Sequence, residues 1–145
     1  MSAPAYDFSV LVHLETESES LYSRVGGDAF FFGLVDRFYT GVASDPVLRP
    51  LYPRDLEPPK RRLALFLIQY WGGPSTYSQE RGHPRLRMRH VRFPIGLRER
   101  DVWLGHMRAA IETSDAAPRD AQALRDYFEM AATSLLNQRE QNVTV

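Results

Sequence analysis

The sequence predicts an all-α protein with one domain, and three observations support this prediction. Apolar residues recur at helical spacing in several separate segments. Proline and glycine stand where these segments begin and end. The main body has no segment with the alternating pattern of a half-buried strand. The 145 residues suffice for one domain with its own core and are too few for two domains of ordinary size.

The composition excludes several classes of protein. Hydrophobic residues make up 43% of the chain, as in a globular domain, and the zero net charge provides no overall field to attract nucleic acid. The absence of cysteine excludes disulfides, cysteine-based zinc sites and thiol nucleophiles. No apolar run reaches the roughly 20 residues of a membrane span, and no secretory signal is recognisable. We therefore expect a cytoplasmic protein that does not associate with membranes.

Both ends of the chain are expected to lie outside the domain. Residues 1–20 end in the polar run Glu15–Ser20, which predicts a flexible N-terminal extension. Residues 138–145 are expected to form a C-terminal tail. The domain itself is predicted to span residues 21–137.

Two helices are expected in the first half of this domain. One follows Gly26-Gly27, and its broad apolar stripe consists of Phe31, Leu34, Val35, Phe38 and Val42. The chain then breaks into turns and a loop at Pro46, Pro50 and Pro53. The second helix starts near Pro58-Pro59 and ends at Gly72-Gly73-Pro74. Its apolar face should consist of Leu63, Phe66, Leu67 and Tyr70. Residues 75–83 are predicted to form a polar loop.

Two further long helices are expected in the second half. The first follows Gly96, and its buried face should include Trp103, Met107, Ala110 and Ile111. A turn over Thr113–Ala117 precedes the last helix, which begins at Pro118. The inward face of this helix should include Leu124, Phe128, Ala131 and Leu135.

The stretch from Arg81 to Pro94 is the most informative in the chain. Pro84 suits the first turn of a helix and Pro94 disfavours its continuation, so a short helix should hold His90 near its end. Histidine is the commonest protein ligand of metals. Other interpretations remain open at this point. His83 and His90 are seven residues apart and form a possible metal pair, but no carboxylate or thiol is spaced to complete it. The arginines form either a solvated surface or a nucleic-acid contact, and they are Arg81, Arg85, Arg87, Arg89 and Arg92.

Three rings with polar edges are the remaining candidates for function. Tyr39, Tyr52 and Trp103 each carry an O–H or N–H donor that needs a partner if it is buried. The ordinary partner of such a donor is a backbone carbonyl. Taken singly, none of the three rings requires a functional interpretation.

Several separated blocks together resemble one known family. They agree with it in order and spacing, and they are Arg37-Phe38-Tyr39, Asp45–Arg49, Gln69–Pro74, Tyr77-Ser78, Arg81–His90 and Glu99–Leu104. Over about residues 21–137 the chain resembles a truncated haemoglobin, most closely the second group or O type. The resemblance implies the truncated globin fold, a two-over-two helical sandwich that encloses one haem.

The resemblance also implies roles for individual residues. His90 would be the proximal ligand of the haem iron, and Tyr39, Tyr52 and Trp103 would stabilise the ligand bound on the distal side. The apolar haem contacts would be Phe31, Leu63, Phe66, Leu67, Phe93 and Met107. The partners of the haem propionates would be Arg62, Tyr77 and Arg89. Residues 54–60 are richer in proline than the family pattern, and a non-donor near Pro59 would leave ligand stabilisation to the three rings.

The implied function is tight binding of O2 with slow release, and CO and NO are further ligands. The haem is expected to be non-covalent haem b, because the chain has no C-x-x-C-H motif. NO dioxygenation and peroxidase-like turnover are enzyme alternatives. The former would require an external reductase, since the chain has no flavin or nicotinamide fingerprint. A homodimer is left open. The alternative from another class is a non-haem helical module that binds nucleic acid through the Arg81–Arg92 segment.

Overall fold

The structure, a computed structural model, describes residues 20–138 and contains no strand in this range, as the sequence predicts. Its elements are α2 (Leu21–Val25), α3 (Asp28–Ala43), the 3-10 turn η1 (Arg49–Leu51), α4 (Glu57–Tyr70), α5 (Thr76–Arg81), α6 (Leu86–His90), α7 (Leu97–Glu112) and α8 (Pro118–Ser134). The expected extension over 1–20 and tail over 138–145 lie outside the described residues, apart from residues 20 and 138. No described helix is long and apolar enough to span a membrane.

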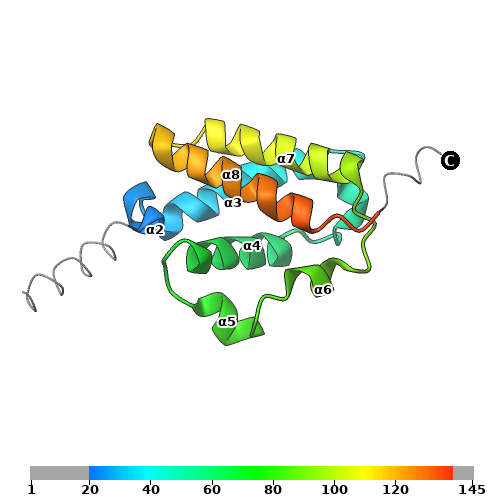
Figure 1. Cartoon of the computed structure of the whole chain (residues 1–145), viewed down its shortest axis with the longest axis horizontal. Coiled ribbons are helices and arrows are strands. Elements are labelled where there is room, and N and C mark those ends of the chain that lie inside the picture. The colour runs from blue at the N-terminus through cyan, green and yellow to red at the C-terminus, as the bar shows by residue number, and fades with distance from the viewer. Residues whose placement is uncertain (1–19, 139–145) are drawn as a thin grey trace, which may run out of the picture.

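Two pairs of antiparallel helices form the body of the molecule. Figure 1 shows α3 beside α4 and α7 beside α8, with the two members of each pair running in opposite directions. The pairs meet chiefly where α3 packs on α7. The short helices α5 and α6 lie at the edge of this body, beyond α4 (Figure 1). This arrangement is the two-over-two sandwich that the resemblance to truncated haemoglobins implies.

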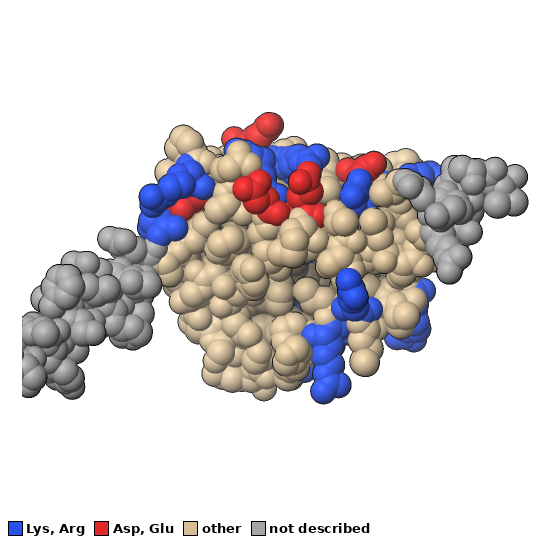
Figure 2. All heavy atoms as spheres, viewed as in Figure 1, with Lys and Arg blue, Asp and Glu red and all other residues tan. Residues whose placement is uncertain are grey.

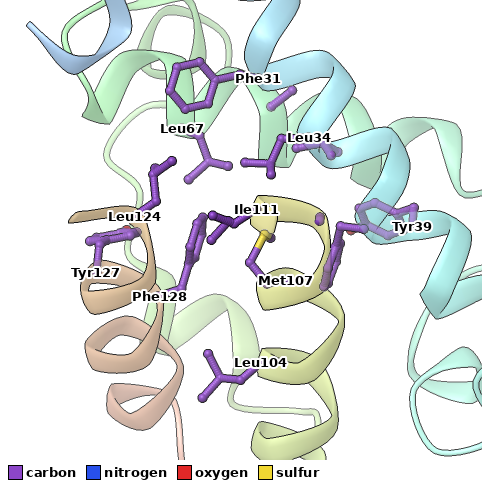
Figure 3. Close-up of a cluster of buried hydrophobic side chains, with 14 of the residues drawn as sticks. Phe31, Leu34, Tyr39, Leu67, Leu104, Met107, Ile111, Leu124, Tyr127 and Phe128 are labelled. Carbon is purple, nitrogen blue, oxygen red and sulfur yellow. The ribbon is translucent and has the colours of Figure 1, made fainter. Parts of the chain in front are cut away.

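The core lies between the two pairs. The predicted stripe of α3 is fully buried, and Tyr39 is buried beside it with 5% of its surface exposed. Figure 3 shows Met107 and Ile111 of α7 pointing toward Leu124 and Phe128 of α8 in this core. Full burial of such side chains stabilises the fold by about 1.5–3 kcal/mol each.

One predicted loop is a helix. Residues 76–81 form α5, although residues 75–83 were expected to be a polar loop. Its residue Tyr77 is 4% exposed, and the ring packs edge-on against Phe66 with centroids 5.5 Å apart. A helix of six residues is too short to produce a visible apolar period, so tertiary packing stabilises it.

The predicted inward face of α4 is also partly wrong. Tyr70 is 50% exposed, whereas Ala64 and Ile68 are buried in the core. On α7, Trp103 is only half-buried, and Leu104 is buried instead. The apolar period gives the faces of a helix, but the neighbouring helices decide which face is covered.

The short helix α6 forms where the prolines predict it, with a different start. It begins at Leu86, because Arg85 has the left-handed φ of 45° and acts as the N-cap. Pro84 therefore precedes the helix and does not occupy its first turn. The helix ends at His90, four residues before Pro94. In addition, the sequence did not predict α2, whose N-cap Ser20 accepts a hydrogen bond from the Ser23 backbone at 3.2 Å.

Candidate functional site

A cavity of about 340 Å³ lies among α4, α6, α7 and α8, and the η1 segment contributes to its wall. This volume falls at the lower end of the range for small-molecule sites. Most of the lining is apolar, and the polar groups come from a few rings, one histidine and several arginines. An apolar pocket with a small number of polar groups is typical of a ligand or cofactor site.

The structure brings all but two of the predicted site residues to this cavity. Those that line it are Tyr39, Tyr52, Arg62, Leu63, Phe66, Leu67, Tyr77, Arg89, His90, Phe93 and Trp103. Phe31 and Met107 do not line the cavity, because both are fully buried in the core between the helix pairs. The apolar pattern of α3 and α7 did not distinguish core positions from cavity positions.

His90 has a fixed ring orientation. Its Nδ1 lies 2.7 Å from the carbonyl oxygen of Leu86, one helical turn earlier. A neutral imidazole that donates from Nδ1 keeps its Nε2 lone pair free to bind a metal. The ring is half-buried, and the Phe93 ring lies beside it with centroids 6.4 Å apart. The geometry suits a single metal ligand.

The three polar rings meet at one part of the wall. Tyr39 and Tyr52 pack edge to face, with ring centroids 5.4 Å apart. Burial raises the pKa of the Tyr39 hydroxyl, and the neighbouring Tyr52 raises it further. Burial also raises the pKa of Tyr52. Its hydrogen bonds with Trp103 and Tyr39 partly oppose this rise. Both hydroxyls therefore stay protonated near neutral pH.

Two arginines, Arg81 and Arg100, line the cavity besides the predicted pair of Arg62 and Arg89. Arg62 has no hydrogen bond or ion pair to a carboxylate among the described residues, whereas Arg89 donates to the carbonyls of Pro84 at 2.7 Å and Arg81 at 3.1 Å. Arg81 lies 6.0 Å from the centre of the Tyr77 ring. Figure 2 shows basic side chains without acidic neighbours near α6, while both signs mix over α7 and α8. Cationic groups at the mouth of an apolar pocket suit a ligand that carries carboxylates.

These features fit haem better than a bare metal ion. The described residues contain no group of three or more histidine, cysteine or acidic side chains that could hold a metal. Haem brings its own equatorial ligands, so one protein imidazole and apolar walls are sufficient to bind it. The donor set at the cavity matches this requirement.

Comparison with known proteins decides the family. Residues 20–137 match the family model of the bacterial-like globins. The chain belongs to this family. Over 114 residues this globin is 40% identical to the group 2 truncated hemoglobin YjbI of Bacillus subtilis (strain 168), with 79% of this chain and 86% of that protein covered. It is therefore a group 2 truncated haemoglobin.

Solved structures agree with this assignment. A thermostable hemoglobin from the actinobacterium Thermobifida fusca is 53% identical to this globin, with a TM-score of 0.82 and coverage of 83% of this chain and 99% of that chain. A truncated oxygen-avid haemoglobin from Bacillus subtilis is 38% identical, with a TM-score of 0.78 and coverage of 82% and 100%. Membership in this family does not favour the nucleic-acid alternative.

Sequence reasoning missed part of the globin's cavity. The end of α8 contributes Phe128, Ala131 and Ala132, and the C-cap residue Leu135 also lines the cavity. The helical spacing of Phe128, Ala131 and Leu135 predicted an inward face, but it did not reveal that this face covers a cavity. Pro59 is buried and lines the cavity, so it presents no side-chain donor there. Ligand stabilisation would then depend on the three rings.

Proposed function

We propose that this globin binds one non-covalent haem b through His90 and holds O2 tightly at the opposite side of the cavity. The observation that supports this most directly is the 2.7 Å bond from His90 Nδ1 to Leu86, because it leaves Nε2 for a metal. CO and NO are expected to bind at the same position. We place the functional domain at residues 21–137 and expect the protein to act in the cytoplasm.

The three rings would act as hydrogen-bond donors toward the ligand. Haem supplies an iron atom with an open coordination position for a diatomic molecule. Donors from Tyr39, Tyr52 and Trp103 would stabilise negative charge on that molecule. A hydrogen bond to a charged acceptor contributes about 1.5–3 kcal/mol, and ~1.4 kcal/mol corresponds to tenfold in affinity. Two such donors would slow release by roughly two or more decades. The oxygen-avid relative in Bacillus subtilis supports this proposal.

The rim of the cavity would hold the haem carboxylates. Arg62 is the first candidate, because its guanidinium has no carboxylate partner among the described residues and lines the cavity. The Tyr77 hydroxyl and the remaining N–H groups of Arg89 would assist. The apolar contacts would come chiefly from Leu63, Phe66, Leu67 and Phe93.

NO dioxygenation and peroxidase-like turnover are a second candidate function. The cluster of Tyr39, Tyr52 and Trp103 favours it, because phenol and indole rings donate protons and electrons as well as hydrogen bonds. NO dioxygenation would need an external reductase to reduce ferric iron. Turnover with NO or peroxide in the presence of a reductant would separate this role from simple oxygen storage.

The absorption spectrum of the purified protein tests the proposal. The wild-type chain should bind one haem per chain and show a Soret band, whereas His90→Ala should lose normal haem coordination. His83→Ala is the matched control, because His83 is exposed and lies outside the cavity lining. A His90→Ala protein with the wild-type spectrum and haem content would refute the role of His90. Absence of a Soret band together with nucleic-acid binding would support the alternative module.

A further inference from the structure

We propose that Asn137 is a positioning residue for His90. It lies just after α8 and holds the segment that follows His90 in place. This inference rests on the proposed function of His90 as the iron ligand. Asn137 does not line the cavity, so it would act through the lining residues that it holds, among them His90.

All polar groups of the Asn137 side chain are bonded to this segment. Its Nδ2 donates to the carbonyl oxygens of Phe93 at 2.9 Å and His90 at 3.3 Å. Its Oδ1 accepts from the Ile95 backbone N–H at 2.8 Å. The Asn137 backbone N–H donates to the Ile95 carbonyl at 2.9 Å. Asn137 therefore bonds to the last residue of α6, His90, and to two residues between α6 and α7, Phe93 and Ile95.

These bonds require an amide at position 137. The side chain donates two N–H bonds to carbonyls and accepts one from a backbone N–H, and only asparagine or glutamine offers two donors and an acceptor on one uncharged group of this shape. Asn137 is exposed, so an unconstrained side chain would bond to water. Three simultaneous protein partners instead indicate a built contact between distant parts of the chain.

The helix that carries His90 depends on such external contacts. With five residues, α6 is far too short to be stable alone. Arg87 Nε donates to the carbonyl of Ser134 at 3.0 Å, which joins α6 to the last residue of α8. Arg89 bonds to Pro84 and Arg81 on the other side of the helix. Asn137 completes this set by bonding to the carbonyl of His90 itself.

The orientation of the imidazole follows from the position of α6. The His90 Nδ1 bonds to the carbonyl oxygen of Leu86 in the same helix, so the ring moves together with α6. Loss of the Asn137 side-chain bonds would remove the direct contacts from the end of α8 to the carbonyls of His90 and Phe93, while Arg87 and Arg89 would still hold α6. The ring would then sample a wider range of orientations, and the iron–histidine bond would weaken.

Asn137→Asp is the sharpest test, because it keeps the shape and the acceptor for Ile95 but replaces both donors with a carboxylate oxygen. Asn137→Ala removes the three side-chain bonds to His90, Phe93 and Ile95, and a fourth from Gln138 Nε2, without adding charge. Gln79→Glu is the matched control: it makes the same amide-to-carboxylate change at an exposed position of α5, where Gln79 Nε2 donates to Ser75 Oγ at 3.1 Å. Each protein is compared in its haem-bound form.

The decisive readout is the iron–histidine stretching band of the ferrous, ligand-free protein in resonance Raman spectra. Both Asn137 variants should shift or broaden this band and lose haem to an acceptor apoglobin roughly three- to tenfold faster. The control should match the wild type in both measurements. An unchanged band in both variants would overturn the proposal, even if thermal stability fell, because the role would then be structural only. The proposed function itself would instead be refuted if the wild-type protein showed no iron–histidine band, or if the band persisted unchanged in His90→Ala.

Discussion

His106 Nε2 lies 2.7 Å from Asp45 Oδ2, which joins α7 to the loop that follows α3. The other carboxylate oxygen, Oδ1, accepts from the backbone N–H groups of Val47 at 2.8 Å and Leu48 at 3.1 Å. This loop leads through η1 to Tyr52. The Asp45 carboxylate therefore orders the part of the chain that delivers a polar ring to the cavity.

We predict that the contribution of Asp45 to stability depends on pH. The hydrogen bond with His106 holds the pKa of Asp45 below its ordinary value of 3.8, and the backbone N–H groups of Leu48 and Val47 act in the same direction. Because the pKa is lower in the folded state than in the unfolded state, the ionised carboxylate stabilises the fold at pH values above the ordinary pKa. This stabilisation disappears as the pH falls through the lowered pKa. Asp45→Asn should therefore be less stable than the wild type at neutral pH, and the difference in denaturation midpoint should narrow below pH 3.8. A difference that stays constant down to acid unfolding would contradict this.

Gly41 is predicted to tolerate no side chain. Replacing glycine with alanine inside a helix ordinarily stabilises it by about 0.8–1.0 kcal/mol. A Cβ at Gly41 would instead overlap the His106 ring, so Gly41→Ala should lower the melting temperature and disturb the contact with Asp45. Gly105→Ala is the control, since a Cβ there has open space on α7 and should raise the melting temperature. Equal effects of the two substitutions would exclude the steric explanation.

The distal rings are predicted to control oxygen release. Tyr39→Phe and Trp103→Phe should each change the O2 dissociation rate by several-fold or more, because each removes a donor to the ligand. Their effects should not be additive, since donors to one acceptor are coupled. A double-mutant cycle measured by stopped flow tests this, with thermal stability recorded alongside. Tyr52→Phe belongs in the same series, because Tyr52 can rotate to replace a missing donor. If each substitution left the O2 dissociation rate nearly unchanged, the effects were additive, and only thermal stability fell, the rings would be ordinary core residues and not ligand donors.

The two arginines among the predicted propionate partners, Arg62 and Arg89, should differ in how they retain haem. Arg62→Ala should speed haem transfer to an acceptor globin by about two- to fivefold at low salt, because a half-exposed charge pair is worth at most about 1 kcal/mol. The effect should shrink as salt screens that pair. Arg89→Ala should also speed transfer, but with little salt dependence, because Arg89 holds α6 through the carbonyls of Pro84 and Arg81. Arg92→Ala, which is exposed and outside the cavity lining, serves as the control. Identical salt dependence in the two variants would remove the distinction.

Short-range patterns predicted the long helices well for a simple reason. The apolar stripe of α3 and the proline at the start of α8 are local features of the sequence. Helix periodicity and helix starts depend on residues close together in the chain, so such features are sufficient to predict them. The same patterns failed at α5, where Tyr77 is buried by Phe66 from a different helix. They also missed Asn137, since nothing in its neighbourhood along the chain indicates that it bonds to residues more than forty positions earlier.

The sequence by itself determined the all-α class, the position of His90 beside a helix end, and the set of polar rings, because these depend on residue type and spacing. Tertiary structure alone decided which apolar residues face the core and which face the cavity. Phe31 and Phe66 are the same residue type on two apolar stripes, yet Phe31 is buried in the core and Phe66 lines the cavity. The hydrophobic effect is non-directional, so it requires that both rings leave water but does not specify what covers them. The packing of α3 against α7, and of α4 along the cavity, makes that choice.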